Sequence, residues 1–161
     1  MRSYFSFCIF AATLSYEGDC LQENINKLSE LCKLDITPHS TRTKDGYHLQ
    51  MFRCKSRSPK LGRIAVPVLM IHGLMQDCDT YLCAGESHSL ASILCEEGYD
   101  VWLCNNRGTK YSQKHDNLSP HDEEFWDFCI DDLATFDVPA FIDYVKSETN
   151  FSKVCVGSNT T

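Results

Sequence analysis

The chain has 161 residues, a formal net charge of −7 and an isoelectric point near 5.3. A chain of this length forms one domain and buries about 70% of the surface that it exposes when unfolded. Its 15 Lys and Arg residues gather in no basic patch, so we expect no nucleic-acid partner. The ten cysteines contain no C-x-x-C pair and no histidine-rich cluster accompanies them, so we expect no metal or other cofactor.

The first residues resemble a targeting segment. Arg2 precedes an apolar run from Tyr4 to Leu14, and small residues follow near its end. This pattern predicts a signal or interfacial anchor in residues 1–16, with an ordinary buried segment as the alternative. The run is shorter than the roughly 20 apolar residues that span a bilayer. We therefore expect the secretory pathway or a membrane-associated location, with residues 17–161 forming the domain.

The next elements are an amphipathic helix and a hairpin. Apolar residues recur at helical spacing over residues 21–32 in a polar background, which predicts a surface helix. Residues 39–53 then form a β-permissive run around the turn Lys44-Asp45-Gly46, followed by apolar residues that alternate with polar ones. That arrangement predicts a β-hairpin.

Residues Ala65 to Ile71 are almost all apolar and lie between turn-forming residues, as in a strand buried on both faces. Pro67 lies within this run, so we expect a local irregularity there. The run ends in His72-Gly73. A loop in this position can direct backbone amides at a developing negative charge, although many parallel strands without that role end in the same dipeptide.

Strands and helices then alternate. No periodicity is present over residues 76–84, whereas residues 88–97 predict a helix that ends at Gly98. Asp100 to Cys104 predicts a second buried strand. An aromatic stripe over residues 125–136 predicts a helix that Pro139 interrupts, and the stripe favours core over ligand binding. Phe141, Ile142 and Val145 then predict a second helix or a kinked continuation. Lys153 to Val156 predicts a third strand, which we expect to turn at Gly157.

Two local patterns need separate interpretation. Gly85 to Ser89 resembles a nucleophile elbow, but no strand precedes it and its last position is not glycine, so we interpret it as a chance match. Cys95 and Cys155 lie in apolar runs, which favours buried free thiols, while disulfides are an alternative if the chain is secreted.

Many short motifs in one order resemble the N-terminal half of the acid lipase and sterol esterase family of α/β-hydrolases, with wording closest to the fungal sterol esterases. The resemblance covers residues 21–157. Its motifs are Thr43 to Tyr47, His72-Gly73-Leu74, Ser89 to Ala91, Gly98 to Trp102, Asn105 to Gly108, Tyr111-Ser112, His115, Leu118 to Pro120, Phe125 to Phe128 and Asp137 to Pro139. The resemblance implies an α/β fold and hydrolysis of water-insoluble esters, such as steryl esters or triacylglycerols, by a serine nucleophile.

The tail departs from this family. The resemblance implies a glycine, any residue and then the nucleophilic serine, but here Ser158 directly follows Gly157 and the second glycine of the elbow is missing. Ser158 is thus a degenerate candidate nucleophile, and the backbone amide of Leu74 is the candidate oxyanion donor. No acid or histidine follows Ser158, and His115 and His121 precede it as loop histidines.

The sequence therefore predicts an incomplete α/β-hydrolase: a parallel sheet with an N-terminal hairpin, truncated at the nucleophile elbow. We expect it to contact a lipid ester or lipid surface and to have negligible esterase activity alone. A non-catalytic binding or regulatory half-domain is the second interpretation, because the sheet edge left after the third strand would pair with a complementary half or with another copy. An incomplete gene model is the third.

Overall fold

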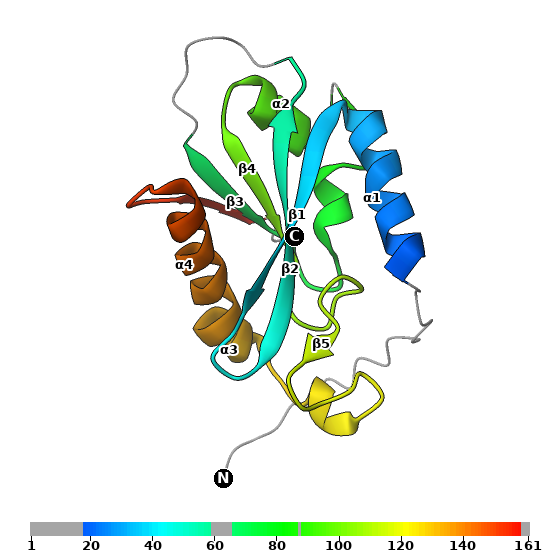
Figure 1. The fold of residues 1–161 in the computed structure, drawn as a ribbon, viewed down its shortest axis with the longest axis vertical. Coiled ribbons are helices and arrows are strands. Elements are labelled where there is room, and N and C mark those ends of the chain that lie inside the picture. Colours follow the sequence, from blue (N-terminus) through cyan, green and yellow to red (C-terminus); the bar gives the residue numbers. More distant parts are fainter. Residues whose placement is uncertain (1–17, 59–65, 87, 159–161) are drawn as a thin grey trace.

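A mixed six-stranded sheet forms the centre of the molecule (Figure 1). The computed structural model describes residues 18–58, 66–86 and 88–158. Five strands lie side by side in the order β1-β2-β4-β3-β6, and the short β5 pairs with β2. Their bounds are Leu34–Arg42 (β1), Tyr47–Ser56 (β2), Pro67–Ile71 (β3), Asp100–Cys104 (β4), Lys114–His115 (β5) and Cys155–Ser158 (β6). The predicted segment 1–16 lies outside the described residues.

The sheet combines a hairpin with a parallel half, as the sequence predicted. β1 and β2 pair antiparallel, with Arg42 opposite His48 across the predicted turn. At that turn Gly46 has a φ of 101°, a conformation that glycine adopts without steric cost. β2 pairs antiparallel with β4, and β3 pairs parallel with both β4 and β6. The carboxyl ends of β3, β4 and β6 therefore meet at one edge of the sheet.

Helices cover both faces of this sheet. The elements are α1 (Gly18–Cys32), the 3-10 helix η1 (Cys78–Tyr81), α2 (Leu90–Glu96), the 3-10 helix η2 (Glu123–Trp126), α3 (Ile130–Asp132), the π-helical segment η3 (Leu133–Asp137) and α4 (Val138–Thr149). α1 and α4 lie on opposite sides of the strands (Figure 1). The predicted helix 21–32 corresponds to α1 and the predicted helix 88–97 to α2.

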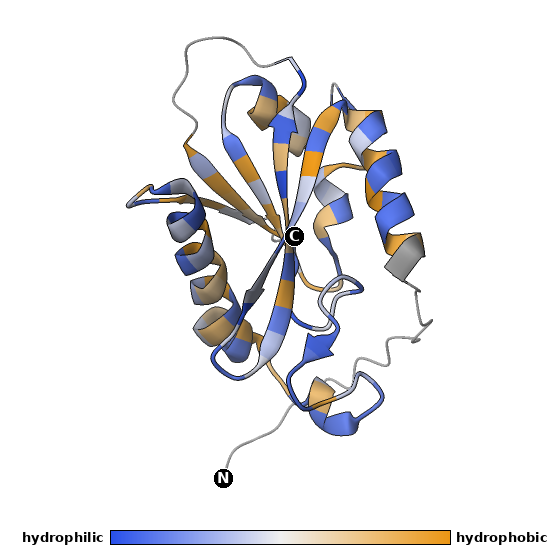
Figure 2. Cartoon of the chain, viewed as in Figure 1, coloured by the Kyte–Doolittle hydropathy of each residue, from blue (hydrophilic) through white to orange (hydrophobic). Residues whose placement is uncertain are grey.

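The alternation of side chains along the strands divides the core into two clusters. In β4, Val101 and Leu103 join the cluster that includes α1, η1 and α2, whereas Trp102 and Cys104 join the cluster on the α4 side. All five residues of β4 are buried, because helices cover both faces of this central strand. In Figure 2 the polar face of α1 points away from the sheet, as amphipathic spacing requires.

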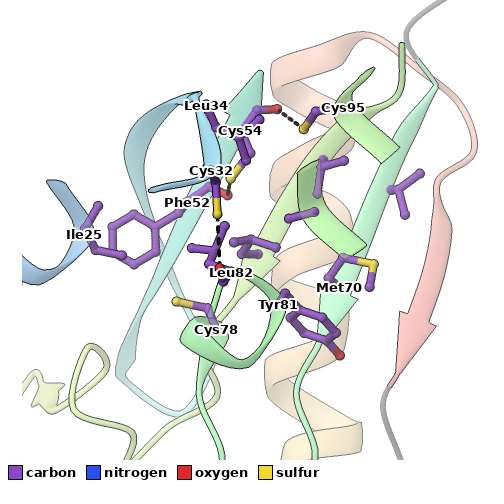
Figure 3. Packing of buried hydrophobic residues seen from close by; sticks show 14 residues of the cluster. Ile25, Cys32, Leu34, Phe52, Cys54, Met70, Cys78, Tyr81, Leu82 and Cys95 are labelled. Carbon is purple, nitrogen blue, oxygen red and sulfur yellow. Dashed lines mark hydrogen bonds between the residues drawn. The ribbon is translucent and has the colours of Figure 1, made fainter. Parts of the chain in front are cut away.

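Free thiols make up an unusual share of the first cluster. Cys32, Cys54, Cys78 and Cys95 are buried there, and Figure 3 shows several of them among aliphatic and aromatic side chains. The Cys95 thiol donates to the Cys54 carbonyl, and that of Cys32 to the Leu82 carbonyl. Burial raises the pKa of the Cys95 thiol to about 12. Burial likewise raises the pKa of Cys54 and Cys78, so these three thiols stay protonated at neutral pH. All four buried cysteines act as small apolar side chains.

Three expectations about the strands were wrong. Pro67 begins β3 instead of interrupting it, and a strand accepts proline at its first residue. The third strand begins at Cys155 and continues through Gly157 and Ser158, which pair with Met70 and Ile71, so the chain does not turn at Gly157. Cys155 was expected to be a buried thiol, but it is exposed because β6 is an edge strand.

The helical expectation for residues 125–145 also needs correction, and a short helix lies within residues 76–84, where the sequence shows no periodicity. The aperiodic stretch contains η1. The aromatic stripe does not lie on one helix: Phe125 and Trp126 belong to η2, and the continuous helical segment begins only at Ile130. Pro139 does not interrupt it but lies in the first turn of α4, where a missing N–H costs little. Phe125 is nevertheless fully buried, so its predicted place in the core is confirmed.

Candidate active site

A tight turn follows β3 at the edge where the parallel strands end. The Gln76 N–H donates to the Gly73 carbonyl (N to O 3.3 Å), which closes a four-residue turn around Leu74 and Met75. Met75 has a φ of 61°, as expected at the third position of a type II turn, where glycine or asparagine is usual. The other non-glycine residues with positive φ in the described part of the chain, Lys33 and Asn150, directly follow helices. The left-handed Met75 is thus a local strain in the candidate oxyanion loop.

This turn presents the predicted oxyanion donor. Within the residues that the structure describes, the Leu74 N–H has no hydrogen-bond acceptor. Leu74 and Met75 are 73% and 77% exposed. An N–H without an internal partner, at the second position of a fixed turn, is available to an oxyanion.

His72 fixes the start of the turn. The residue is 7% exposed, and its Nε2 accepts a hydrogen bond from the Asn106 N–H (3.1 Å). Because Nε2 is the acceptor, the proton resides on Nδ1, which donates to the Gly73 carbonyl (2.9 Å). Burial lowers the pKa of His72 below 6.5, because it disfavours the charged ring. His72 is therefore a neutral structural link and not a general base.

Two consecutive residues at the exit of β4 hold the two ends of this loop. Asn106 contacts His72 through its backbone, and the Asn105 side-chain oxygen accepts from the Cys78 N–H (3.0 Å). Both asparagines are buried. Asp77 caps η1 by accepting from the Asp79 N–H. The candidate oxyanion turn is thus anchored on both sides to the neighbouring parallel strand.

Ser158 lies at the same edge of the sheet, paired in register with Ile71 at the end of β3. Its side chain is exposed, and residues 159–161 lie outside the described part of the chain. A groove of about 360 Å³ runs beside it. Its lining residues come from β3, η1, the loop between η1 and α2, the start of α2 and β6. They are Met70, Thr80, Tyr81, Ala84, His88, Ser89, Leu90, Gly157 and Ser158. The elbow geometry and the role of Ser158 stay predictions.

The other candidate residues have structural roles. Ser89, the last residue of the elbow-like stretch, caps α2 by accepting from the Ser92 N–H, while Ser87 lies outside the described residues. His115 lies in β5, where its Nε2 contacts the Asp45 carbonyl (2.9 Å). His121 is exposed. In the described ranges, no group of three or more His, Cys, Asp or Glu residues could hold a metal ion.

Sequence reasoning missed a hydrogen-bond network around the buried Arg107, which directly follows Asn106 in the sequence. Arg107 donates to both carboxylate oxygens of Asp45 (2.6 and 3.0 Å) and, through its backbone N–H and Nε, to Asp137 (2.9 and 2.8 Å). Its guanidinium lies 4.0 Å from the centre of the Tyr47 ring. The network joins the hairpin turn, the β4 exit and the π-helical segment. Its members lie in three of the motifs of the family resemblance, Thr43 to Tyr47, Asn105 to Gly108 and Asp137 to Pro139, but nothing in the sequence paired them.

Comparisons with known proteins agree with the fold and with the loop after β3. Residues 25–85 match the family model described as a partial alpha/beta-hydrolase lipase region, and residues 66–158 match the alpha/beta hydrolase fold. A probable lipase of Schizosaccharomyces pombe is 38% identical over 153 residues, which are 93% of this chain and 34% of that protein. Triacylglycerol lipase 1 of Arabidopsis thaliana is 43% identical over 121 residues, which are 75% of this chain and 30% of that protein.

A solved structure shares the fold at low sequence identity. The Pyrococcus furiosus esterase Pf2001 aligns with a TM-score of 0.55 and 16% identity over 84% of this chain and 42% of the esterase. The chain thus spans about a third of the length of the curated relatives that it matches. No helix in the described part of the chain has the length and apolarity needed to cross a membrane. The chain belongs to the α/β-hydrolase family, and within it to the acid lipases.

Proposed function

We propose that this chain is the N-terminal part of a lipid-ester hydrolase and that its turn after β3 supplies one donor of the oxyanion hole. The observation that carries this proposal is the Leu74 N–H, which has no acceptor in the described chain and lies in a turn anchored to β4 on both sides. A fixed N–H of this kind stabilises the negative charge that develops on the carbonyl oxygen of an ester during attack.

The second part of the proposal concerns the nucleophile. Ser158 is the candidate, because it ends β6 beside β3, at the edge where Leu74 lies. The 161 residues contain no Asp, Glu or His after Ser158, so this stretch supplies no acid or base in the order that α/β-hydrolases use. Without those groups the serine hydroxyl is not activated, and we expect negligible ester turnover by this chain alone.

The proposed substrate class rests on the name of one relative and on the family resemblance of the sequence. The Arabidopsis relative is named a triacylglycerol lipase. We propose triacylglycerols or steryl esters as the substrates of the protein to which this chain corresponds, and a lipid surface as its partner. Residues 1–16 support a location in the secretory pathway or at a membrane, because an apolar run after Arg2 is typical of a signal or anchor.

The first experiment uses a p-nitrophenyl ester of a short fatty acid. The chain alone should give no turnover above that of its Ser158→Ala variant. Fusing the chain at Ser158 to the remaining two thirds of the Schizosaccharomyces pombe probable lipase should restore turnover, because we expect the acid and base of an α/β-hydrolase to follow the nucleophile in the sequence. In the fusion, Leu74→Pro should lower kcat about 100-fold, which is typical of losing one oxyanion donor.

Leu74→Ala is the matched control, because alanine keeps the N–H and should leave kcat within a few-fold of the parent. Proline suits the second position of a type II turn, so Leu74→Pro removes the donor without opposing the backbone conformation. Equal kcat values for the proline and alanine variants would rule out the proposed oxyanion role. Turnover by the isolated chain that Ser158→Ala abolishes would overturn the expectation of inactivity.

A second candidate function is a non-catalytic binding or regulatory half-domain. The observation that favours it is the edge strand β6, where Cys155 is exposed and the Val156 side chain is 51% exposed. Such an edge offers unpaired backbone groups to another strand. A complementary hydrolase half or a second copy of this chain could supply that strand.

A further inference from the structure

The turn around Leu74 is closed by two reciprocal hydrogen bonds between the same two residues. The Gln76 N–H donates to the Gly73 carbonyl, and the Gly73 N–H donates to the Gln76 side-chain oxygen Oε1 (3.2 Å). The first bond is the ordinary closure of a β-turn. The second depends on the Gln76 side chain, which replaces the acceptor that the Gly73 N–H loses when the chain leaves β3.

This side-chain bond opposes a conformational strain. Met75 is held at a φ of 61°, where an L-residue other than Asn or Asp is disfavoured by contact between its Cβ and the backbone. Without a restraint, Met75 would return to negative φ by rotation of the Leu74–Met75 peptide. Release of Gly73 from the Gln76 side chain would also free the Gly73–Leu74 peptide, which carries the Leu74 N–H, to rotate at the flexible glycine. His72 and Asn105 hold residues on either side of the turn, but neither contacts Leu74 or Met75 by a hydrogen bond.

We propose that Gln76 is a positioning residue for the oxyanion hole: its side chain holds the Leu74 N–H in one direction by closing the turn through Gly73. The inference rests on the proposed function of the Leu74 amide and adds a side chain to it. Gln76 need not touch the substrate. Its contribution is that the donor is oriented before the negative charge forms, so that no reorganisation is needed during the reaction.

The inference is tested first on the full chain, by NMR measurements that do not depend on enzyme activity. In Gln76→Ala the Gly73 N–H loses its acceptor, and its hydrogen-exchange rate, measured by NMR on ¹⁵N-labelled protein, should rise about 10-fold, the effect of one net hydrogen bond. The scalar coupling of the Met75 amide should show a shift of φ from positive to negative values. Gln76→Glu is the matched control, because it keeps a side-chain acceptor and should preserve both signals.

A rescue variant separates positioning from a general loss of structure. Glycine adopts positive φ without steric cost, so Gln76→Ala combined with Met75→Gly should recover the turn. In the active fusion, Gln76→Ala should lower kcat about 10-fold with KM unchanged, and the double variant should regain most of that loss. An unaltered Met75 coupling and Gly73 exchange rate in Gln76→Ala would overturn the inference, as would an unchanged kcat despite an altered turn.

The two proposals can fail separately. If the Leu74 amide has no role, Leu74→Pro leaves kcat unchanged while Gln76→Ala still alters the NMR signals of the turn. If Gln76 does not position the amide, Leu74→Pro still lowers kcat while Gln76→Ala changes neither the turn nor the rate. Spectra of residues in β4, which lie outside the turn, report whether each variant keeps the fold.

Discussion

The His72 side chain forms hydrogen bonds with two loops. It follows β3 directly, accepts from the Asn106 N–H and donates to the Gly73 carbonyl. Both bonds need the neutral ring with its proton on Nδ1. The exit of β4 and the candidate oxyanion turn are therefore coupled through the protonation state of a single imidazole.

This coupling predicts a pH dependence of stability. The pKa of His72 is below 6.5 in the folded chain and near 6.5 in the unfolded chain. Between these two pKa values the unfolded state therefore binds more protons than the folded state. The contribution of the neutral ring is complete above about pH 6.5 and is lost as the pH falls toward the folded-state pKa. His72→Gln removes the titration, so the stability difference between wild type and variant should shrink between about pH 8 and about pH 5.

Urea unfolding at a series of pH values measures that difference. His39 also has a lowered pKa, because of its burial, but it is present in both proteins and cancels from the comparison. A difference that stays constant over the whole range would mean that His72 is not buried as the neutral ring.

At the scale of elements, the sequence predicted the sheet better than the helices. Strand runs such as Asp100 to Cys104 are continuously apolar, which is how a strand covered on both faces is recognised. The aromatic residues near 125 share a core with α4 but not a helix, so their periodic spacing misled the prediction. The π-helical segment η3 has no periodic signature at all. It ends at Asp137, whose partner Arg107 is 30 residues away.

The residues of the site could be predicted only where their pattern is local in the sequence. Leu74 was found because His72-Gly73-Leu74 is a local pattern at the end of a strand. The contacts of Asn105 and Asn106 with this loop join residues far apart in sequence, and only the fold brings them together. The side-chain bond of Gln76 is local but lies in an aperiodic loop, where spacing gives no signal.

The Arg107 to Asp137 pair gives a prediction about the stability of these elements. Burial raises the pKa of Asp137 despite the hydrogen bonds from Arg107, so taking its charge out of water is costly. Asp137→Asn leaves the buried guanidinium with one carboxylate fewer and should lower the free energy of unfolding by about 3 kcal/mol. Denaturant unfolding at neutral pH measures the change.

Asp35→Asn is the matched control, because Arg57 also pairs with two acidic residues, Glu30 and Asp35, but at the surface. Solvent screens that pair, and its removal should change stability far less than the loss at Asp137. Equal effects of the two substitutions would mean that the Arg107 network is hydrated in solution.

At the scale of the whole molecule, the sheet has two unlike edges. β1 ends one side and is part of a hairpin that α1 and α4 contact. β6 ends the other side with only four residues, and its pattern is mostly exposed. The chain spans about a third of its relatives, and among the described residues no strand pairs with the outer side of β6. The open edge is therefore the surface where this chain should meet another strand.

We predict that the chain self-associates through β6 in a concentration-dependent manner. Sedimentation velocity under reducing conditions, which exclude a disulfide through Cys155, should show dimers or larger species at micromolar concentration. Val156→Lys places a charge on the edge strand and should shift the population to monomer, because edge charges oppose strand pairing.

Ile130→Lys is the matched control. Ile130 is 73% exposed at the start of α3, away from β6, and its substitution should leave the association unchanged. A monodisperse folded monomer at all concentrations would contradict the half-domain interpretation, because the edge would then be stable without a partner.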